Sequence, residues 1–150
     1  MNFISISAFD KDLKKLQKKY SSLNDDIENL KTILRLYPKS RPPFSFTIPG
    51  LRLKQPIIKF KRIACQSLKG KGNNSGLRLI YTYNEETDTI TFIEIYHKNQ
   101  KELEDRERII RLIILLHHPI CYYHIAKITC TNTFYGNSGP YAIFRREWSG

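Results

Sequence analysis

Apolar residues in the first part of the chain recur at helical spacing, in two stretches separated by a pair of serines. The first stretch has its apolar side chains at Phe9, Leu13, Leu16 and Tyr20, and the second at Leu23, Ile27, Leu30 and Leu34. Intervals of three and four residues are typical of a helix with one buried face. Pro38 ends the second helix. The pattern predicts a helical hairpin, preceded by a short strand in NFISIS and started by Ser7 with Asp10 as a cap.

The hydrophobic period changes to two residues after the proline-rich segment 38–50, which we expect to be a loop. Alternation predicts strands over residues 57–65, 77–84 and 90–98. Asn99, with Glu102 three residues later, predicts the start of a third helix that runs to Leu116. The order β-α-α-β-β-β-α predicts an α+β fold, with an antiparallel twisted sheet, an N-terminal helical hairpin and a C-terminal helix.

The chain of 150 residues is long enough for one domain with a core, which we place at residues 1–116. Residues 117–150 show no sustained period, and we leave them as an unassigned C-terminal extension. The apolar run IIRLIILL is too short to span a bilayer, which takes about 20 residues, so no membrane partner is expected.

Cysteine usage and the N-terminus indicate a cytoplasmic protein. The three cysteines, Cys65, Cys121 and Cys130, are scattered and odd in number, which argues against a disulfide framework. The N-terminus carries neither the basic start nor the apolar run of a signal peptide. Cys121 and His124 have ligand-like spacing, but a second close pair is absent, so no metal site is predicted.

Charge is strongly positive and unevenly spread. Lysines and arginines number 25 against 14 acidic residues, a formal net charge of +11, and no acidic residue occurs between Glu28 and Glu85. Such a cationic centre favours a polyanionic partner, nucleic acid above all. A basic surface that only keeps the protein soluble would give the same net charge.

The most suggestive motif for a cofactor, KGKGNNSG, fails as a nucleotide-binding loop. Its glycines are Gly70, Gly72 and Gly76, so the third stands one position too late for G-x-G-x-x-G. A strand follows the motif where a helix is required. The glycines and asparagines fit a hairpin between two strands, and no cofactor is predicted.

The strands beside this hairpin carry the candidate chemistry. Side chains alternate between the faces of a strand, so Lys59 and Lys61 share one side, with Arg62 opposite. Tyr96 and Lys98 share a side with Glu94, and Ile93, Ile95 and His97 share the other. We expect the cations and Tyr96 to collect with Arg78 on an open face of the sheet. The alternative is an ordinary solvated face of a half-buried sheet.

The ordered motifs FDKDLKKLQKKY, KFKR, KGKGNNSGLRLIYTY and ITFIEIYHKNQKE resemble the RelE/ParE toxin superfamily, in particular its RelE/HigB-like branch. The resemblance covers about residues 2–116. It implies the toxin of a type II toxin–antitoxin pair, which enters the ribosome and cuts mRNA with the RNA's own 2′-OH as nucleophile. It also implies a cognate, acidic antitoxin as partner.

Four residues match the family's catalytic cations: Lys61 as general base, Lys59 as phosphate binder, Arg78 as transition-state stabiliser and Lys98 as acid or electrostatic stabiliser. Four more would bind RNA: Arg62, Lys69, Lys71 and Tyr96, the last by stacking on a base. A crowd of cations favours the neutral form of one lysine, which can then accept a proton. His97 is a weaker acid–base candidate, because its side of the strand is opposite that of Lys98.

The chain departs from the family at two of these positions. RelE members carry an arginine where Lys98 stands, and a functional tyrosine in the last helix at a position that falls near Glu104 here. Two alternatives therefore stay open, a ParE-like inhibitor of DNA gyrase that does no catalysis and an inactive toxin relative.

Overall fold

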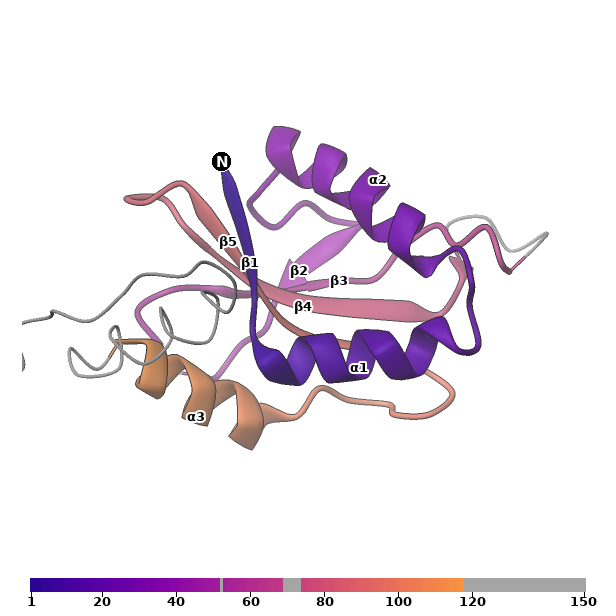
Figure 1. Ribbon diagram of the computed structural model, residues 1–150. Helices are drawn as coiled ribbons and strands as arrows, with labels where there is room; N and C mark the ends of the chain where they lie inside the picture. The colour runs from indigo at the N-terminus through magenta and orange to yellow at the C-terminus, as the bar shows by residue number, and fades with distance from the viewer. Residues whose placement is uncertain (52, 69–73, 118–150) are drawn as a thin grey trace, which may run out of the picture. The chain divides into compact units, whose positions relative to one another are not determined.

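Five strands form one mixed sheet in the order β1-β5-β4-β3-β2, with three helices packed on it (Figure 1). The computed structural model describes residues 1–51, 53–68 and 74–117. The strands are β1 (Asn2–Ser5), β2 (Ser45–Thr47), β3 (Ile57–Phe60), β4 (Leu77–Asn84) and β5 (Thr89–His97). The helices are α1 (Ser7–Gln17), α2 (Leu23–Leu36) and α3 (Arg106–His117). The predicted α+β class and helical hairpin are confirmed.

Three features of the sheet differ from the sequence prediction. β1 runs parallel to β5, so the sheet is mixed and not wholly antiparallel. The proline-rich segment contains a short strand, β2, whose Phe46 lies opposite Lys59 of β3. The predicted strand from residue 57 ends at Phe60, not at residue 65. β2 had a signal in the sequence, because Phe44, Phe46 and Ile48 alternate with polar residues.

The helical hairpin covers one face of the sheet. A cluster of buried side chains joins Phe9 and Leu16 of α1 and the apolar stripe of α2 to inward-facing residues of the strands, among them Leu79 and Ile95. Both predicted helical stripes are buried in this cluster. The N-cap of α1 is Ile6, with no side-chain hydrogen bond, so the predicted Ser7–Asp10 cap is wrong.

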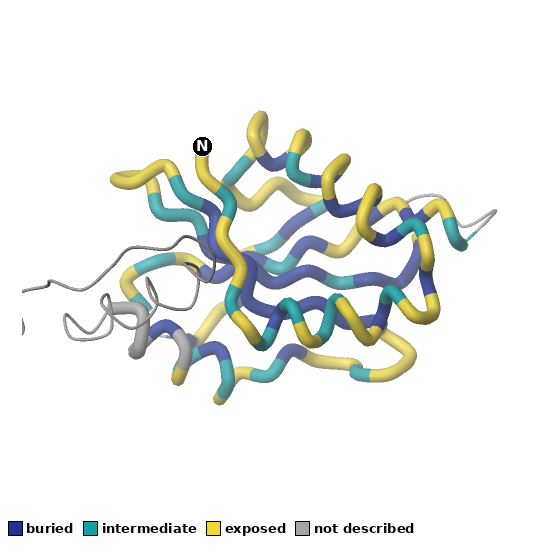
Figure 2. Tube along the Cα trace, viewed as in Figure 1, coloured by how far each residue is buried: buried dark blue, intermediate teal, exposed yellow. Residues whose placement is uncertain are grey.

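The opposite face of the sheet is covered as well, over part of its area. Ile109 and Ile113 of α3 pack with Ile80, Ile93 and Tyr96 in a second buried cluster. The central strands β4 and β5 are accordingly buried along most of their length (Figure 2). The expectation of an open face is therefore wrong where α3 covers the sheet, and the exposed cations Lys61, Arg62 and Lys98 lie just past the ends of β3 and β5.

α3 begins later than predicted. Asn99 does not cap a helix, because residues 98–100 form a turn and no helix follows until Arg106; the Asn99 N–H donates to His97 Nδ1 at 3.1 Å. The first residue of α3 is Arg106, and the N–H of Arg108 is bound by Asp105 Oδ1 at 2.9 Å, which is an N-cap contact. Residues 98–105 are thus a connection that carries three acids, Glu102, Glu104 and Asp105, of which Glu104 is buried.

A β-bulge changes the facing of one residue in β5. Ile80 lies opposite Glu94 and Tyr81 opposite Phe92, which leaves Ile93 as an extra residue. Ile93 therefore packs with Tyr96 in the cluster under α3, while Ile95 packs against the helical hairpin. Strict alternation placed Ile93 and Ile95 on the same side, and the bulge corrects this prediction.

Residues Met1–Ile113 form one compact unit. The predicted domain of residues 1–116 and the extension 117–150 stay predictions, because residues 118–150 lie outside the described part of the chain. Among the described helices, none is both long and apolar enough to cross a membrane.

Candidate functional site

Four of the predicted cations meet at one pocket, where β3 ends, β4 begins and β5 ends. Lys61 follows the last residue of β3, Arg78 is the second residue of β4, and Lys98 follows the last residue of β5. Arg78 lies opposite Tyr96 in the sheet register, which brings it close to Lys98, two residues after Tyr96. The pocket has a volume of about 360 Å³ and is lined by Pro43, Phe46, Lys61, Arg62, Asn74, Gly76, Arg78 and Lys98. Among these lining residues none is acidic, so the pocket is suited to an anion.

Arg78 is held in the pocket by backbone carbonyls. Its Nη1 donates to the carbonyl oxygen of Lys61 at 2.6 Å and to that of the preceding residue, Leu77, at 2.9 Å. A guanidinium carries five N–H donors in a fixed plane, so one nitrogen can bind the protein while the others face a ligand. The contact also ties the end of β3 to the start of β4, which fixes Arg78 relative to Lys61.

Lys61 and Arg62 are exposed and lie over aromatic rings. The Lys61 Nζ is 4.4 Å from the ring centre of Phe46, and the Arg62 guanidinium is 5.8 Å from that of Phe44. The Lys61 N–H donates to the Phe44 carbonyl at 2.8 Å, which holds this residue against the β2 segment. Arg62 lines the same pocket as Lys61, although alternation placed it opposite, because β3 has already ended at Phe60.

Gly76 forms part of the wall between Arg78 and Lys98. Its φ is +86°, and its carbonyl accepts the Lys98 N–H at 2.9 Å. A β-carbon there would lie 2.9 Å from His97 Nε2, closer than real β-carbons come to their neighbours. Glycine at this position lets the chain just before β4 approach the end of β5, which brings Arg78 and Lys98 to the same pocket.

His97 has a structural role on the far side of the sheet. Its ring is stacked on Tyr20, with ring centres 5.9 Å apart. Its Nε2 lies 2.9 Å from the Ser75 carbonyl, and its Nδ1 accepts the Asn99 N–H. Both ring nitrogens are engaged with backbone groups, which fits a neutral imidazole with the proton on Nε2. The predicted separation of His97 from Lys98 agrees with this arrangement.

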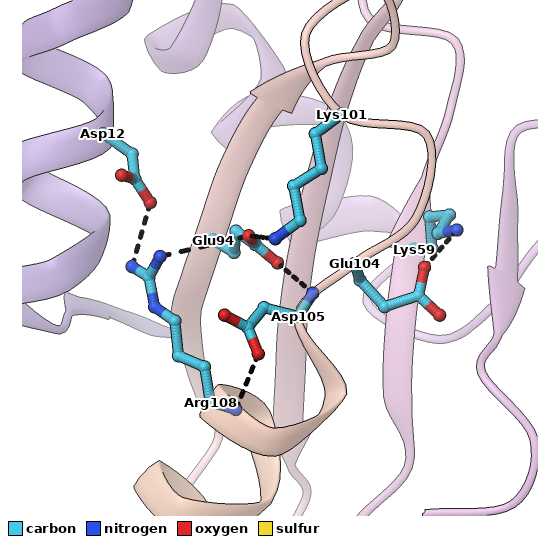
Figure 3. A network of polar contacts seen from close by, with 7 residues as sticks. All are labelled: Asp12, Lys59, Glu94, Lys101, Glu104, Asp105 and Arg108. Carbon is cyan, nitrogen blue, oxygen red and sulfur yellow. Dashed lines mark hydrogen bonds and ion pairs between the residues drawn. The ribbon is translucent and has the colours of Figure 1, made fainter.

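Lys59 is not among the residues that line the pocket. Its Nζ forms an ion pair with Glu104, and both side chains are largely buried, at 14% and 4% exposed (Figure 3). Burial disfavours the charged Glu104, but the hydrogen bond and attraction of Lys59 outweigh it and hold the pKa of the carboxyl below its ordinary value. This ion pair holds Lys59 against the connection before α3.

A second buried carboxylate, Glu94, joins three elements in the same region. Its Oε1 lies 2.5 Å from Lys101 Nζ and 3.9 Å from Arg108 Nη1, and its Oε2 accepts the Asp105 N–H at 3.2 Å. Arg108 also reaches Asp12 of α1 at 2.9 Å (Figure 3). The network fastens α3 to β5 and α1, so it supports the fold rather than the pocket.

Tyr96 is buried, at 6% exposed, and packs in the cluster under α3. Burial first, and then the nearby carboxylates Glu104 and Glu94, raise the pKa of its hydroxyl to about 12. The hydroxyl has no hydrogen-bond partner among the described residues. The predicted base-stacking role does not fit this position, because its ring is already covered by protein atoms.

The two remaining candidates, Lys69 and Lys71, lie outside the described residues. So do the cysteines and most histidines of the C-terminal extension. Among the described residues, no group of three or more histidines, cysteines or acids could hold a metal ion. Sequence reasoning missed Pro43 and Phe46 as lining residues because it treated segment 38–50 as a plain loop, and it assigned Asn74 only a role in the turn between two strands.

Comparison with known proteins adds little to this geometry. No family model matches the chain, and no curated protein matches it. Among solved structures, the chain is similar to the solution structure of the conserved hypothetical protein HP0892 from Helicobacter pylori, at 23% sequence identity. The match covers 67% of this chain and 97% of HP0892, with a TM-score of 0.41. A likeness of this degree carries no argument about activity, which has to be argued from the site's own residues.

Proposed function

We propose that the protein is a toxin of a toxin–antitoxin pair that cuts mRNA on the ribosome. The observation that carries this proposal is the meeting of Lys61, Arg62, Arg78 and Lys98 at one pocket whose described lining has no carboxylate. Such a pocket suits the anionic phosphodiester backbone of RNA. The resemblance of the ordered motifs to RelE-like toxins supports the same reaction.

The reaction needs only groups that this pocket offers. Lys61, as general base, takes the proton of the RNA 2′-OH, and the 2′ oxygen forms a bond to the adjacent phosphorus. Arg78, and Arg62 beside it, stabilise the extra negative charge on the phosphoryl oxygens. The bond from phosphorus to the 5′ oxygen then breaks, and the Lys98 ammonium protonates the leaving oxygen. The products are a 2′,3′-cyclic phosphate and a 5′-hydroxyl.

Lys59 and Tyr96 have no part in this proposal. Lys59 is bound by Glu104 and Tyr96 is buried under α3, so neither reaches the substrate without a rearrangement. Lys69 and Lys71, on the hairpin, would bind the ribosome or RNA backbone. An acidic antitoxin would cover the basic pocket in the cytoplasm, where electrostatic complementarity favours its association.

The test is cleavage of a reporter mRNA on purified ribosomes by wild type and by the double variant Lys61→Ala/Arg78→Ala. We expect the double variant to lose about 100-fold or more in cleavage rate, as removal of a transition-state donor does. The double variant Lys14→Ala/Lys15→Ala is a charge-matched control, since both lysines are exposed on α1. Unchanged cleavage by the pocket variant would overturn the site assignment.

A supercoiling assay with DNA gyrase, run beside the ribosome assay, separates this proposal from a ParE-like activity. Inhibition of gyrase by wild type, with no cleavage of mRNA, would favour the gyrase inhibitor. If expression of the folded protein in growing cells impairs neither translation nor DNA supercoiling, the result would favour an inactive relative.

A further inference from the structure

Three cation–aromatic pairs follow the chain segment that leads from α2 to the pocket. The Arg41 guanidinium lies 3.9 Å from the ring centre of Tyr37, which is stacking distance. Arg62 lies over Phe44 and Lys61 over Phe46. Only the last two cations belong to the pocket, so the Tyr37–Arg41 pair is a separate feature beyond its rim.

The segment is fixed by hydrogen bonds, so the pair is positioned before any ligand arrives. The Arg41 N–H donates to the Ser45 hydroxyl at 2.8 Å, and the Arg41 carbonyl accepts the N–H groups of Phe44 and Ser45 at 2.9 Å. Tyr81, buried in the core, donates its hydroxyl to the Pro38 carbonyl at 3.1 Å. A preorganised surface loses little entropy on binding.

The pair is continuous with the pocket. Pro43, two residues after Arg41, lines the pocket together with Phe46, and Arg62 both lines the pocket and lies over Phe44. Tyr37 is 46% exposed and Arg41 is exposed, so both side chains are accessible to a ligand. Residues 37–46, which form this segment, include no acidic residue. The carboxylate of Glu85 forms an ion pair with Lys39 of the segment, at 2.9 Å.

We propose that Tyr37 and Arg41 form a subsite for single-stranded RNA next to the pocket, in which a base stacks on the outer face of the Arg41 guanidinium. A guanidinium that lies over an aromatic ring can offer its other face to a base, while its N–H groups can bind the neighbouring phosphate. Arg62 binds the phosphate between this subsite and the pocket. The choice of single-stranded RNA as the ligand of this subsite rests on the proposed function, but binding of RNA to the subsite can be measured without cleavage.

The test measures binding of fluorescein-labelled uridine monophosphate and of oligouridine of 12 nucleotides by anisotropy, at fixed low salt. We expect Tyr37→Ala and Arg41→Ala each to weaken binding of the 12-mer about tenfold, in line with the loss of one stacked base. The labelled mononucleotide, which is too short to occupy both the pocket and the subsite, loses much less. Arg41→Lys keeps the charge but not the plane, and loses most of the same affinity.

Arg35→Ala is the matched control, because Arg35 is also exposed on the surface and lies over an aromatic ring, that of Phe3 in the edge strand β1, at 5.1 Å. Arg35→Ala removes one positive charge, as Arg41→Ala does, but it does so beside β1, the edge strand opposite β2. If Arg41→Ala weakens the 12-mer no more than Arg35→Ala, the subsite is wrong. The same holds if RNA affinity stays unchanged while binding of polyglutamate is lost, which would indicate a surface for an acidic protein.

The two proposals fail separately in this design. Wild type that binds the 12-mer through Tyr37 and Arg41 but does not cut mRNA would contradict the proposed function and keep the subsite. Wild type that cuts mRNA, with equal 12-mer affinity in wild type and Arg41→Ala, would contradict the subsite and keep the proposed function.

Discussion

Glu104 binds the ammonium of Lys59 beneath the sheet, at the point where the chain enters α3. The contact joins Lys59 of β3 to Glu104, which follows β5 along the chain. It therefore links the connection before α3 to a strand that lies two positions away from β5 in the sheet. Both side chains are largely buried. A buried ion pair of this kind is costly to break, because the remaining charge loses its partner without regaining water.

Glu104→Gln is therefore expected to destabilise the protein by about 3 kcal/mol at neutral pH, since it leaves the Lys59 ammonium unpaired in a buried position. The measurement is urea unfolding followed by circular dichroism. Glu102→Gln is the control, because Glu102 is exposed in the same connection. The double variant Lys59→Met/Glu104→Leu should recover most of the loss. A cost below about 0.5 kcal/mol for Glu104→Gln, within the usual range of surface changes, would contradict this role.

The same pair predicts a pH dependence. The pKa of Glu104 is lowered in the folded protein, so its contribution to the free energy of unfolding is complete above the ordinary glutamate pKa of about 4.3 and is lost as the pH falls through the lowered value. Wild type should lose more stability than Glu104→Gln between pH 5 and the acid limit of folding. Parallel pH profiles for the two proteins would argue against an ionised Glu104.

Gly76→Ala should be more damaging than Gly50→Ala, although both glycines have positive φ, +86° and +80°. A β-carbon at position 76 meets His97 Nε2 at 2.9 Å, whereas at position 50 the nearest atom is Arg106 Nη1 at 3.6 Å. Both variants strain the backbone, by about 1 kcal/mol or more, and only the first also displaces His97 and Lys98. Urea unfolding of the two variants tests this, and equal losses would mean that the contact with His97 relaxes at no cost.

The sequence predicted most of the elements because their signals are local. The stripe from Phe9 to Tyr20 and the alternation of Leu77 to Asn84 each depend on neighbouring residues alone. The same signals placed Arg78 and Lys98 at strand ends, whereas Lys61 was expected inside a strand over residues 57–65 that in fact ends at Phe60. The burial of Lys59 and Tyr96 could not be predicted in this way, because it depends on where α3 packs, and that depends on contacts such as Ile109 with Ile80 that are far apart along the chain.

The start of α3 shows how two plausible local signals compete. Asn99 and Asp105 are both good N-cap residues by type, and each is followed by acids and lysines or arginines. The structure has Asp105 as the N-cap, because its Oδ1 accepts the Arg108 N–H at 2.9 Å, while residues 98–100 form a turn. Asp105→Ala should cost about 1 kcal/mol in urea unfolding, Asp105→Asn much less, and Asn99→Ala little, since it removes no helix cap. Equal effects of Asp105→Ala and Asn99→Ala would contradict the later start.

Two buried tyrosines of neighbouring strands should respond in opposite ways to loss of their hydroxyl groups. Tyr81→Phe removes a hydrogen bond to the Pro38 carbonyl, at 3.1 Å, and should cost about 1 kcal/mol. Tyr96→Phe removes a hydroxyl that has no partner among the described residues, and should leave stability unchanged or raise it. The Tyr96 hydroxyl stays protonated below a pH of about 12, so the comparison holds across the neutral range.

Tyr96→Phe also tests whether Tyr96 acts on RNA, since a residue that only packs under α3 can lose its hydroxyl without effect on cleavage. We expect the variant to cut mRNA on ribosomes at the wild-type rate and to bind oligouridine with the wild-type affinity. A stability gain with full activity would confirm a packing role. A loss of cleavage with stability retained would mean that α3 moves away from the sheet when RNA binds, and that the hydroxyl then reaches the substrate.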